Sequence, residues 1–354
     1  MIDRTLYNQP LVSICIPTYN SARFLRECLD SIVNQTYSNK EIIVSDNAST
    51  DETEKIVKEY VEKYKVKYYR NEKNIGGEAN FDRCIELANG EYITIFHSDD
   101  LYMPGIVQKQ VQTFQENSSV GAVFACANFI NNYGKVVGES KLPIELRNKR
   151  IYYFPDIFLS ILSNLNFLIC PSAMVRGKIY KELVPFNADS FGTSADLDMW
   201  LRILERQPIA IIDEKLMGYR ISNTQGSFYS RYLRTEQADF FKVIDYYLST
   251  KVNNINIPKS NLNKYEFLRS IDKIRCAVNY LIQGKEKYAK RLLKKTFSFY
   301  IFLGAISSFK KTKFLIYWIS GLILLVLICL GLGKYIGKSL YYLLYRWKRN
   351  LYNR

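Results

Sequence analysis

The N-terminal part of the chain alternates between short apolar runs and segments with helical spacing of apolar residues, and this alternation restricts the fold more than any other feature. The apolar runs cover residues 11–16, 41–45, 66–69 and 92–96. Short strands that alternate with amphipathic helices are typical of βαβ units, whose crossovers are right-handed. The sequence therefore predicts an α/β fold with a mostly parallel sheet that is flanked by helices.

The pattern divides the chain into three parts. Shorter strands and further helices continue to about residue 225, which predicts one α/β domain over 1–225. Beyond it the spacing of apolar residues is helical, with helices expected at 231–248 and 264–283, and we assign 226–295 to a C-terminal helical region. Residues 296–354 are expected to form a membrane-associated segment with a basic tail.

The membrane assignment depends on residues 314–332, a run of nineteen residues that has no charge and is rich in Leu and Ile. Such a run is typical of a transmembrane helix, and lysines at both ends argue against a buried core helix. Trp and Tyr near its ends are typical of membrane interfaces. We expect a transmembrane helix near 314–333. The shorter stretch 296–309 is expected at the interface or as a re-entrant segment, and its entry into the bilayer is left open.

The net charge of +15 lies almost wholly in the C-terminal segment. Residues 285–354 contain fifteen Lys or Arg and one acid, so they carry +14, whereas residues 1–284 carry only +1. A nucleic-acid-binding domain would carry this charge on its folded body, so we expect no nucleic-acid partner. A basic segment beside an apolar helix instead favours an anionic membrane surface.

The cysteines and the N-terminus indicate a reducing compartment. The seven cysteines are odd in number and contain no CxxC pair, so they indicate neither a disulfide framework nor a zinc site. Residues 1–10 lack the apolar stretch of a signal peptide. Nine Lys or Arg at 285–313, against six after the apolar run, favour the N-terminal side as the inner one. We expect a place at the cell (inner) membrane with the α/β domain on the cytoplasmic side.

Polar loops follow all four apolar runs. They are Pro17–Asn20, Asp46–Asp51, Asn71–Gly77 and His97–Asp100. Open parallel sheets bind ligands at the carboxyl ends of their strands, and all four loops are expected at that edge. Each loop alone has a simpler interpretation as a turn or a helix cap, and for Asp51 the cap is the better one. Four polar loops at one edge nevertheless predict an active site.

The residue types in these loops suit a phosphorylated ligand. Asp99 and Asp100 are suited to hold Mg²⁺ or Mn²⁺, which neutralises a departing diphosphate. Tyr19 offers an aromatic face and Asp46 a hydrogen-bond acceptor for a nucleoside. A reaction at a hydroxyl also needs a base, which a carboxylate farther along the chain would supply.

Together these segments resemble the family 2 glycosyltransferases of the GT-A fold, over roughly residues 10–225. The motifs are loose singly but specific in this order: Leu11–Asn20, Ser45–Asp51, Asn74–Arg83, His97–Asp100 and Ala195–Arg202. The resemblance implies a Rossmann-like sheet of the GT-A type. It also implies an inverting transfer of a sugar from a nucleotide-diphosphate sugar to an acceptor hydroxyl.

The resemblance assigns roles to individual residues. Asp196 takes the place of the catalytic base, with Asp198 as the runner-up, and Asp99 and Asp100 take the place of the metal ligands. The donor-binding residues that it implies are Pro17, Thr18, Tyr19, Asp46, Asn80, Arg83, Ser98 and Asp99. The expected cofactor is a divalent metal ion, Mg²⁺ or Mn²⁺.

Two positions depart from the family pattern. His97, the only histidine, stands where many members have the first Asp of the metal motif, and both direct ligation and a supporting role are open. Ser222 stands where relatives have a His, so we expect a more loosely held metal, with Arg220 as a candidate phosphate contact. His97, Asp198 and Arg220 are therefore candidates for supporting or phosphate contacts.

The favoured acceptor is a lipid-linked glycan in bacterial surface polysaccharide biosynthesis, because the basic segment places the enzyme beside anionic lipid. Transfer to polyprenyl phosphate itself is the alternative, and a non-catalytic nucleotide-sugar-binding membrane protein is a third. The sugar, the nucleotide, the linkage, the metal preference and the oligomeric state are left open by the sequence.

Overall fold

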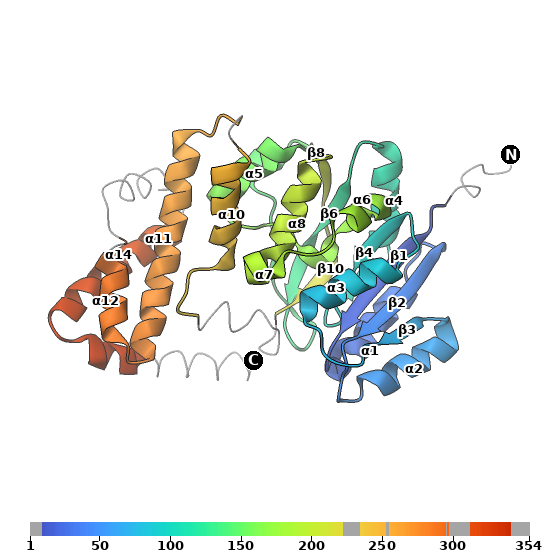
Figure 1. Ribbon diagram of the computed structural model, residues 1–354, viewed down its shortest axis with the longest axis horizontal. Coiled ribbons are helices and arrows are strands. Elements are labelled where there is room, and N and C mark those ends of the chain that lie inside the picture. The colour runs from blue at the N-terminus through green and yellow to red at the C-terminus, as the bar shows by residue number, and fades with distance from the viewer. Residues whose placement is uncertain (1–8, 222–233, 253–254, 295, 297–311, 341–354) are drawn as a thin grey trace. The chain divides into compact units, whose positions relative to one another are not determined.

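The computed structural model describes residues 9–221, 234–252, 255–294, 296 and 312–340 (Figure 1). The chain divides into two compact units, which are described separately. The first consists of Met1–Ser160 and Asn166–Asn223, and the second of Ile161–Leu165 and Thr224–Arg354.

One ten-stranded sheet forms the centre of the first unit, with the strand order β3-β2-β1-β4-β9-β6-β10-β5; β7 pairs with β6 and β8 with β10. The strands are β1 (Val12–Thr18), β2 (Lys40–Asp46), β3 (Lys67–Arg70), β4 (Tyr92–Ile95), β5 (Leu101–Tyr102), β6 (Ala122–Ile130), β7 (Val136–Glu139), β8 (Ile151–Tyr152), β9 (Met174–Arg176) and β10 (Ile209–Arg220). The first four strands pair in parallel, as the apolar runs predict, and so do β6 and β10. The short strands β5, β7, β8 and β9 pair antiparallel. Six strands thus run in the same direction, as expected, and four short antiparallel strands make the sheet mixed.

Strand β9 determines which strand ends meet. It lies between β4 and β6 and is antiparallel to both, so β4 and β6 run in the same direction. Because β10 is parallel to β6, and β1 and β2 are parallel to β4, the carboxyl ends of these five strands lie at one edge. This is the edge at which the polar loops were expected.

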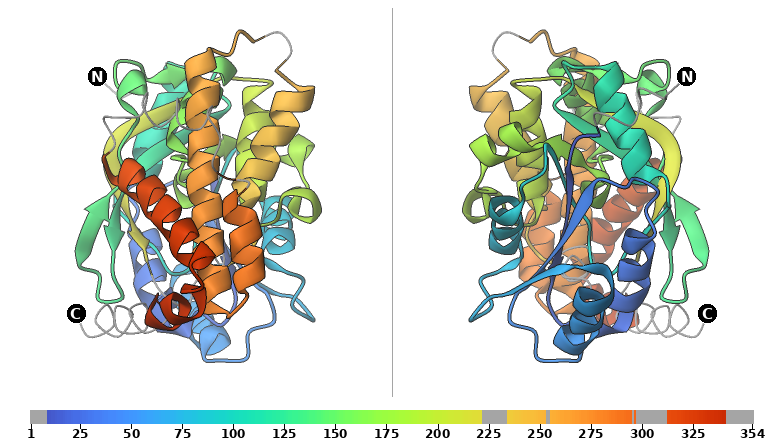
Figure 2. Two further views of the ribbon diagram at one scale, coloured as in Figure 1. Left: turned by 90° about the vertical axis from the view of Figure 1, so that its left-hand side faces the viewer. Right: turned by 90° about the vertical axis from the view of Figure 1, so that its right-hand side faces the viewer.

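Helices cover both faces of the sheet (Figures 1 and 2). The helices of this unit are α1 (Ala22–Val33), α2 (Thr53–Tyr64), α3 (Gly77–Leu87), α4 (Ile106–Glu116), α6 (Gly177–Leu183), α7 (Ala188–Phe191) and α8 (Ala195–Leu204), and α5 (Phe154–Asn164) joins the two units in sequence. The apolar stripe expected on α1 is buried, and it packs in the same core as Val12, Ile14 and Ile16 of β1. Cys15 faces the other side, where its thiol contacts the carbonyl of Cys84 in α3 at 3.4 Å.

The second unit is helical. It contains α10 (Asp239–Thr250), α11 (Lys259–Ile282), α12 (Glu286–Lys294) and α14 (Thr312–Cys329). The helix expected at 231–248 begins only at Asp239 in the described residues. The reason is that Arg234 and the Ala238 N–H both bind the carboxylate of Asp272 on α11, which holds the preceding segment outside the helix.

No helix in the described part of the chain is long and apolar enough to cross a membrane. The transmembrane helix expected near 314–333 is therefore not supported. Helix α14 ends at Cys329, Gly331 follows with a φ of +79°, and Leu324 and Ile328 pack in a core with α11 and α12. Most of the stretch 296–309 lies outside the described residues, as does the basic tail beyond residue 340.

Candidate active site

Hydrogen bonds join three of the polar loops at the carboxyl edge of the sheet. The Asn20 N–H donates to Ser49 Oγ and the Ser21 N–H to Thr53 Oγ1, both at 2.9 Å, which joins the loops after β1 and β2. The hydroxyls of Ser21 and Ser98 are 2.8 Å apart, which joins the loop after β4 to them. The loops therefore converge, as the strand order predicts.

Asn47 ties the loop after β3 to the same edge. Its Nδ2 donates to Asn74 Oδ1 (2.9 Å) and to the Gly76 carbonyl (3.0 Å), and its Oδ1 accepts from the Ile75 N–H (2.9 Å). A Cβ added at Gly76 or Gly77 would meet no atom within 4 Å, so open space lies at the start of α3. The free N–H groups of a helix start beside such a space suit a diphosphate.

His97, Asp99 and Asp100 form a group of potential metal ligands whose ligand atoms lie within 4.8 Å of one another. Burial raises the pKa of Asp100 well above its usual range, with a further rise from the charge of Asp99, and burial lowers the pKa of His97. His97 Nε2 and Asp100 Oδ2 are buried without a hydrogen-bond partner. Such atoms are costly, and a divalent cation with oxygen and imidazole ligands would satisfy both. The residues present therefore fit a divalent metal.

The protein backbone at this cluster is held from several sides. The His97 N–H donates to the Tyr102 hydroxyl at 2.7 Å, and the Tyr102 ring stacks on Phe96 with centroids 3.7 Å apart. The His97 ring lies 5.6 Å from the ring of Phe81 in α3. These contacts fix the direction in which the cluster faces.

Arg220, the last residue of β10, is fully buried and binds the same loop. Its N–H donates to Asp100 Oδ1 and its Nε to the Asp99 carbonyl, both at 2.7 Å. Its Nη2 donates to Glu27 Oε2 at 2.9 Å. The structure thus places Arg220 in a supporting role, and its contact with a phosphate stays a prediction.

Asp196 lies in the first turn of α8 and is partly buried, and this burial raises its pKa to about 6. A carboxylate with this pKa is ionised at neutral pH and more basic than an exposed one, which suits a general base. The pKa of the Cys170 thiol is raised by burial and by the charges of Asp196, Asp100 and Glu78. Asp196 and Asp100 of the metal-ligand cluster thus both raise the pKa of the same thiol.

Asp198, the alternative base, has protein hydrogen-bond partners in the core. It is buried, and one carboxylate oxygen accepts hydrogen bonds from Asn187 Nδ2 (2.7 Å) and Arg202 Nε (2.8 Å). Arg202 also donates to the carbonyl of Pro185 at 3.1 Å. This network fixes the segment before α8, so the structure favours Asp196 over Asp198 as the base.

Two of the expected donor-binding residues are buried, Asp46 at the end of β2 and Asn80 in α3. Asp46 accepts from the Ser49 N–H (2.9 Å) and from the Tyr68 hydroxyl (2.7 Å), so both of its oxygens have protein partners. Asn80 accepts from the Ser45 hydroxyl at 2.7 Å and donates to the Ser45 carbonyl at 2.9 Å. In the structure both side chains stabilise the loops, and their contact with the donor stays a prediction.

Of the other expected donor-binding residues, Tyr19 and Arg83 are exposed, whereas Pro17, Thr18 and Ser98 are buried. The Tyr19 side chain is 48% exposed, beside Thr18, whose Oγ1 is buried without a partner. Pro17 lies in the ladder between β1 and β2, and Ser98 bonds to Ser21 as described above. Arg83 is exposed on α3 and lies 3.6 Å from Glu86. Tyr19 is thus accessible to a ligand, whereas the Thr18 hydroxyl is buried.

Sequence reasoning missed three residues of this edge: Ser21, Glu78 and Cys170. Ser21 follows directly on the first polar loop, at the start of α1, and that position was a usable signal. Glu78 lies in the first turn of α3. Cys170 carried no signal, because the short helical turn Cys170–Ser172 follows no apolar period.

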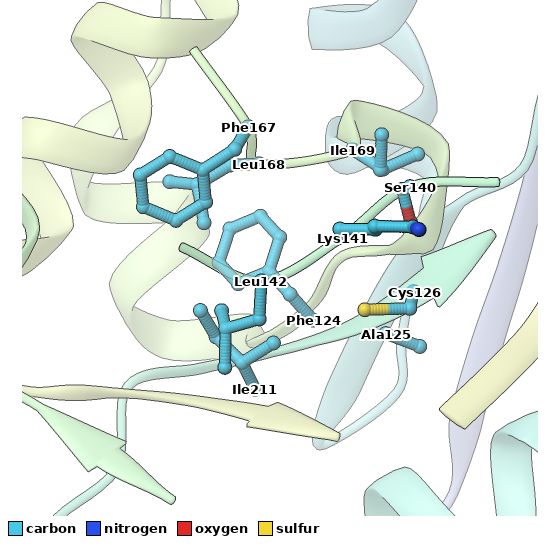
Figure 3. Close-up of a pocket in the computed structure, with 10 residues that line it drawn as sticks. All are labelled: Phe124, Ala125, Cys126, Ser140, Lys141, Leu142, Phe167, Leu168, Ile169 and Ile211. Atoms are coloured by element: carbon cyan, nitrogen blue, oxygen red, sulfur yellow. The ribbon is translucent and has the colours of Figure 1, made fainter. Parts of the chain in front are cut away.

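A separate small hollow lies on the first unit (Figure 3). Its lining residues come from β6, from β10 and from the segments 140–142 and 167–169. None of the expected site residues lines it, so it is distinct from the cluster at His97–Asp100.

Comparison with known proteins identifies the family. A family model described as glycosyl transferase family 2 matches residues 13–184. The uncharacterized glycosyltransferase MJ1057 of Methanocaldococcus jannaschii is 31% identical over 256 residues, which are 70% of this chain and 84% of that protein. This chain belongs to the family 2 glycosyltransferases. The family that the sequence motifs suggested is thereby confirmed.

Two further relatives are longer than this chain. An uncharacterized glycosyltransferase of Rickettsia felis is 32% identical over 230 residues, which are 62% of this chain but 35% of that protein. Chondroitin synthase of Escherichia coli is 27% identical over 247 residues, which are 69% of this chain and 34% of that protein. The crystal structure of Staphylococcus aureus TarS 1–349 has a TM-score of 0.53 at 17% identity and covers 90% of this chain and 91% of that one. This likeness supports the GT-A-like fold of the glycosyltransferase.

Proposed function

We propose that this glycosyltransferase is inverting and metal-dependent, and that it moves a sugar from a nucleoside diphosphate sugar to a hydroxyl of a lipid-linked glycan in surface polysaccharide biosynthesis. One observation carries the proposal: the cluster of His97, Asp99 and Asp100 has two unpartnered buried atoms, and the charges of Asp100 and Asp196 both raise the pKa of the Cys170 thiol. A metal site and a carboxylate of raised pKa are the two groups that such a transfer needs. TarS was crystallised in complex with UDP, which supports a donor of this chemical class.

In the proposed mechanism, His97, Asp99 and Asp100 would hold a Mg²⁺ or Mn²⁺ ion, which would neutralise charge on the departing diphosphate. Asp196 accepts the proton of the acceptor hydroxyl while the hydroxyl oxygen bonds to the anomeric carbon. The bond from this carbon to the diphosphate oxygen breaks on the opposite face, and its electron pair leaves with the diphosphate. The anomeric configuration inverts in one step, without a covalent sugar–enzyme intermediate.

The test is a screen of the purified protein against UDP-, GDP- and dTDP-sugars with Mg²⁺ or Mn²⁺, read as release of the nucleoside diphosphate. We expect release from one donor class, loss of release with EDTA, and a fall of about 100-fold or more in acceptor-dependent turnover for Asp196→Asn. Asp189→Asn is the matched control, because Asp189 is an exposed carboxylate of the nearby helix α7. Full turnover in Asp196→Asn would show that another group is the base.

We also propose that the protein works at the inner membrane with its active site in the cytoplasm. The support is a stripe of exposed apolar residues along α14, flanked by the lysines and arginines that give residues 285–354 a charge of +14. The stripe consists of Ile316, Ile319, Ile323, Val326 and Leu330, which are 44–69% exposed. An apolar helix face beside basic residues suits the interface of an anionic bilayer. Two copies of so basic a segment repel each other, which disfavours self-association through this stripe.

Vesicle sedimentation tests this placement. We expect the protein to bind vesicles with phosphatidylglycerol, to bind phosphatidylcholine vesicles weakly, and to lose about 10-fold in affinity on Ile323→Glu. Equal binding to both lipids, or a dimer that Ile323→Glu dissociates, would contradict it. A comparison of a glycan-bearing lipid with bare polyprenyl phosphate as acceptor distinguishes the proposed substrate from its alternative.

A further inference from the structure

Arg220 is a charged side chain with no exposure to solvent, at the carboxyl end of β10. An arginine in such a place is stable only when its N–H groups are paired, because burial of an unpaired charge is very costly. Its Nε donates to the Asp99 carbonyl (2.7 Å), its Nη1 to the Asn131 carbonyl (3.1 Å) and its Nη2 to Glu27 Oε2 (2.9 Å). The guanidinium also lies 4.3 Å from the ring centroid of Phe24.

These partners come from different parts of the sheet edge. Glu27 and Phe24 belong to α1, Asp99 to the loop after β4, and Asn131 to the residue that follows β6. One planar guanidinium therefore fixes the position of three elements relative to one another. Since the fork of N–H groups has a rigid geometry, the loop carbonyl of Asp99 has little freedom to move.

The backbone of the same residue orients the neighbouring carboxylate. The Arg220 N–H donates to Asp100 Oδ1 at 2.7 Å, whereas Asp100 Oδ2 is buried and has no hydrogen-bond partner. One oxygen of Asp100 is thus anchored to β10, and the other is left for a ligand beside His97 and Asp99. Asp99 is held through its carbonyl, and Asp100 through its carboxylate.

We infer that Arg220 is the positioning residue of the metal site: it holds the Asp99–Asp100 dipeptide so that its ligand atoms face His97, and it does so without touching the metal. This inference rests on the proposed metal-dependent function. Positioning groups behind metal ligands affect metal affinity by about 10–100-fold when they are removed. Loss of the Arg220 side chain therefore weakens metal binding, whereas loss of an ordinary buried arginine lowers only stability.

The chain offers a matched control in Arg176, the last residue of β9. Its Nε donates to the Val120 carbonyl (2.7 Å), its Nη2 donates to the Ser118 carbonyl (3.0 Å), and its guanidinium lies 5.0 Å from the ring centroid of Phe114. Arg176 thus shares the carbonyl and aromatic contacts of Arg220, but it has no contact with the metal-ligand loop in the described structure.

The experiment measures Mn²⁺ binding to the purified full-length chain by electron paramagnetic resonance, without donor or acceptor. Wild type, Arg220→Met, Arg220→Lys and Arg176→Met are compared, with thermal unfolding in EDTA as the measure of stability. We expect Arg220→Met to bind Mn²⁺ at least about 10-fold more weakly than wild type. The Mn²⁺ affinity of Arg220→Lys is expected to lie between those of wild type and Arg220→Met, because an ammonium group retains the charge but not the planar set of N–H donors. Arg176→Met is expected to lose stability and to keep wild-type affinity.

The outcomes separate this inference from the proposed function. Wild-type Mn²⁺ affinity in a folded Arg220→Met protein would overturn the positioning role and leave the metal site intact. Equal weakening in Arg176→Met would also overturn it, because general loosening of the fold would then explain the effect. No Mn²⁺ binding by wild type would refute the metal-dependent function and the positioning role together. If Arg220→Met does not fold, Arg220→Lys takes its place: weaker Mn²⁺ binding than wild type supports the positioning role, and wild-type affinity overturns it.

Discussion

The raised pKa of Asp196 predicts that Asp196→Asn stabilises the fold while it abolishes the reaction. Burial raises this pKa from its ordinary 3.8 to about 6. The folded state therefore holds the proton more tightly than the unfolded state does. The stability that this proton provides is complete below about pH 4 and is lost as the pH rises through about 6. Above that pH the buried charge destabilises the native protein, and asparagine does not carry it.

The size of the effect follows from the shift. A difference of about 2 pKa units corresponds to about 3 kcal/mol when the folded carboxyl is fully ionised. By proton linkage, the buried carboxylate lowers the free energy of unfolding by about 3 kcal/mol at pH 7.5 and by about 1 kcal/mol at pH 4.5. The increase in the free energy of unfolding on Asp196→Asn should therefore be about 2 kcal/mol larger at pH 7.5 than at pH 4.5.

Urea unfolding in EDTA at the two pH values measures this difference, since EDTA removes any metal that would alter the balance. Asp189→Asn, at an exposed site, controls for the loss of one negative charge. A gain in stability that is the same at both pH values would refute the reasoning. So would a loss at pH 7.5, because the carboxylate would then be stabilised by a partner rather than destabilised by burial.

Further predictions follow from the same structure. The acid limb of the pH profile of kcat/KM should have its midpoint near pH 6, and a midpoint near 4 would exclude Asp196 as the base. Asp198→Ala should lower the free energy of unfolding by about 3–5 kcal/mol, because it leaves Arg202 without its buried partner; denaturant titration measures this. Thr18→Val should raise stability by about 1 kcal/mol in the absence of ligands, because the Thr18 hydroxyl is buried without a partner; a loss of stability in the same titration would contradict that.

The sequence predicted the elements whose signals are local. The strands β1–β4 and helix α1 follow from apolar runs and helical spacing, and their order places the polar loops at one edge. Strand β9 has only three residues, too few to show a period, and without it the mixed character of the sheet is hidden. The end of α14 at Cys329 was hidden for another reason: hydropathy alone does not show where packing against α11 ends the helix.

The sequence predicted those parts of the site whose residues are close together in the chain. The metal-ligand cluster follows from the His97–Asp100 motif. The choice between Asp196 and Asp198 had a local signal that was not used: Arg202 lies four residues after Asp198 on the same helix, a spacing typical of ion pairs. The hydrogen-bond partners of Arg220 lie 89 to 193 residues away in sequence, so only the folded sheet reveals them.

The antiparallel strand β9 has a consequence for how this enzyme can diversify. By separating β4 from β6 it opens a gap of two strand spacings, about 10 Å, between the loop with the metal ligands and the hairpin after β6. Because β9 begins at that edge, the chain that fills the gap is the segment that leads to Met174 and contains Cys170. This segment belongs to neither the parallel strands nor the nucleotide loops. Changes in its length or side chains can therefore reshape this part of the edge, while the parallel strands and the polar loops that follow them keep their positions.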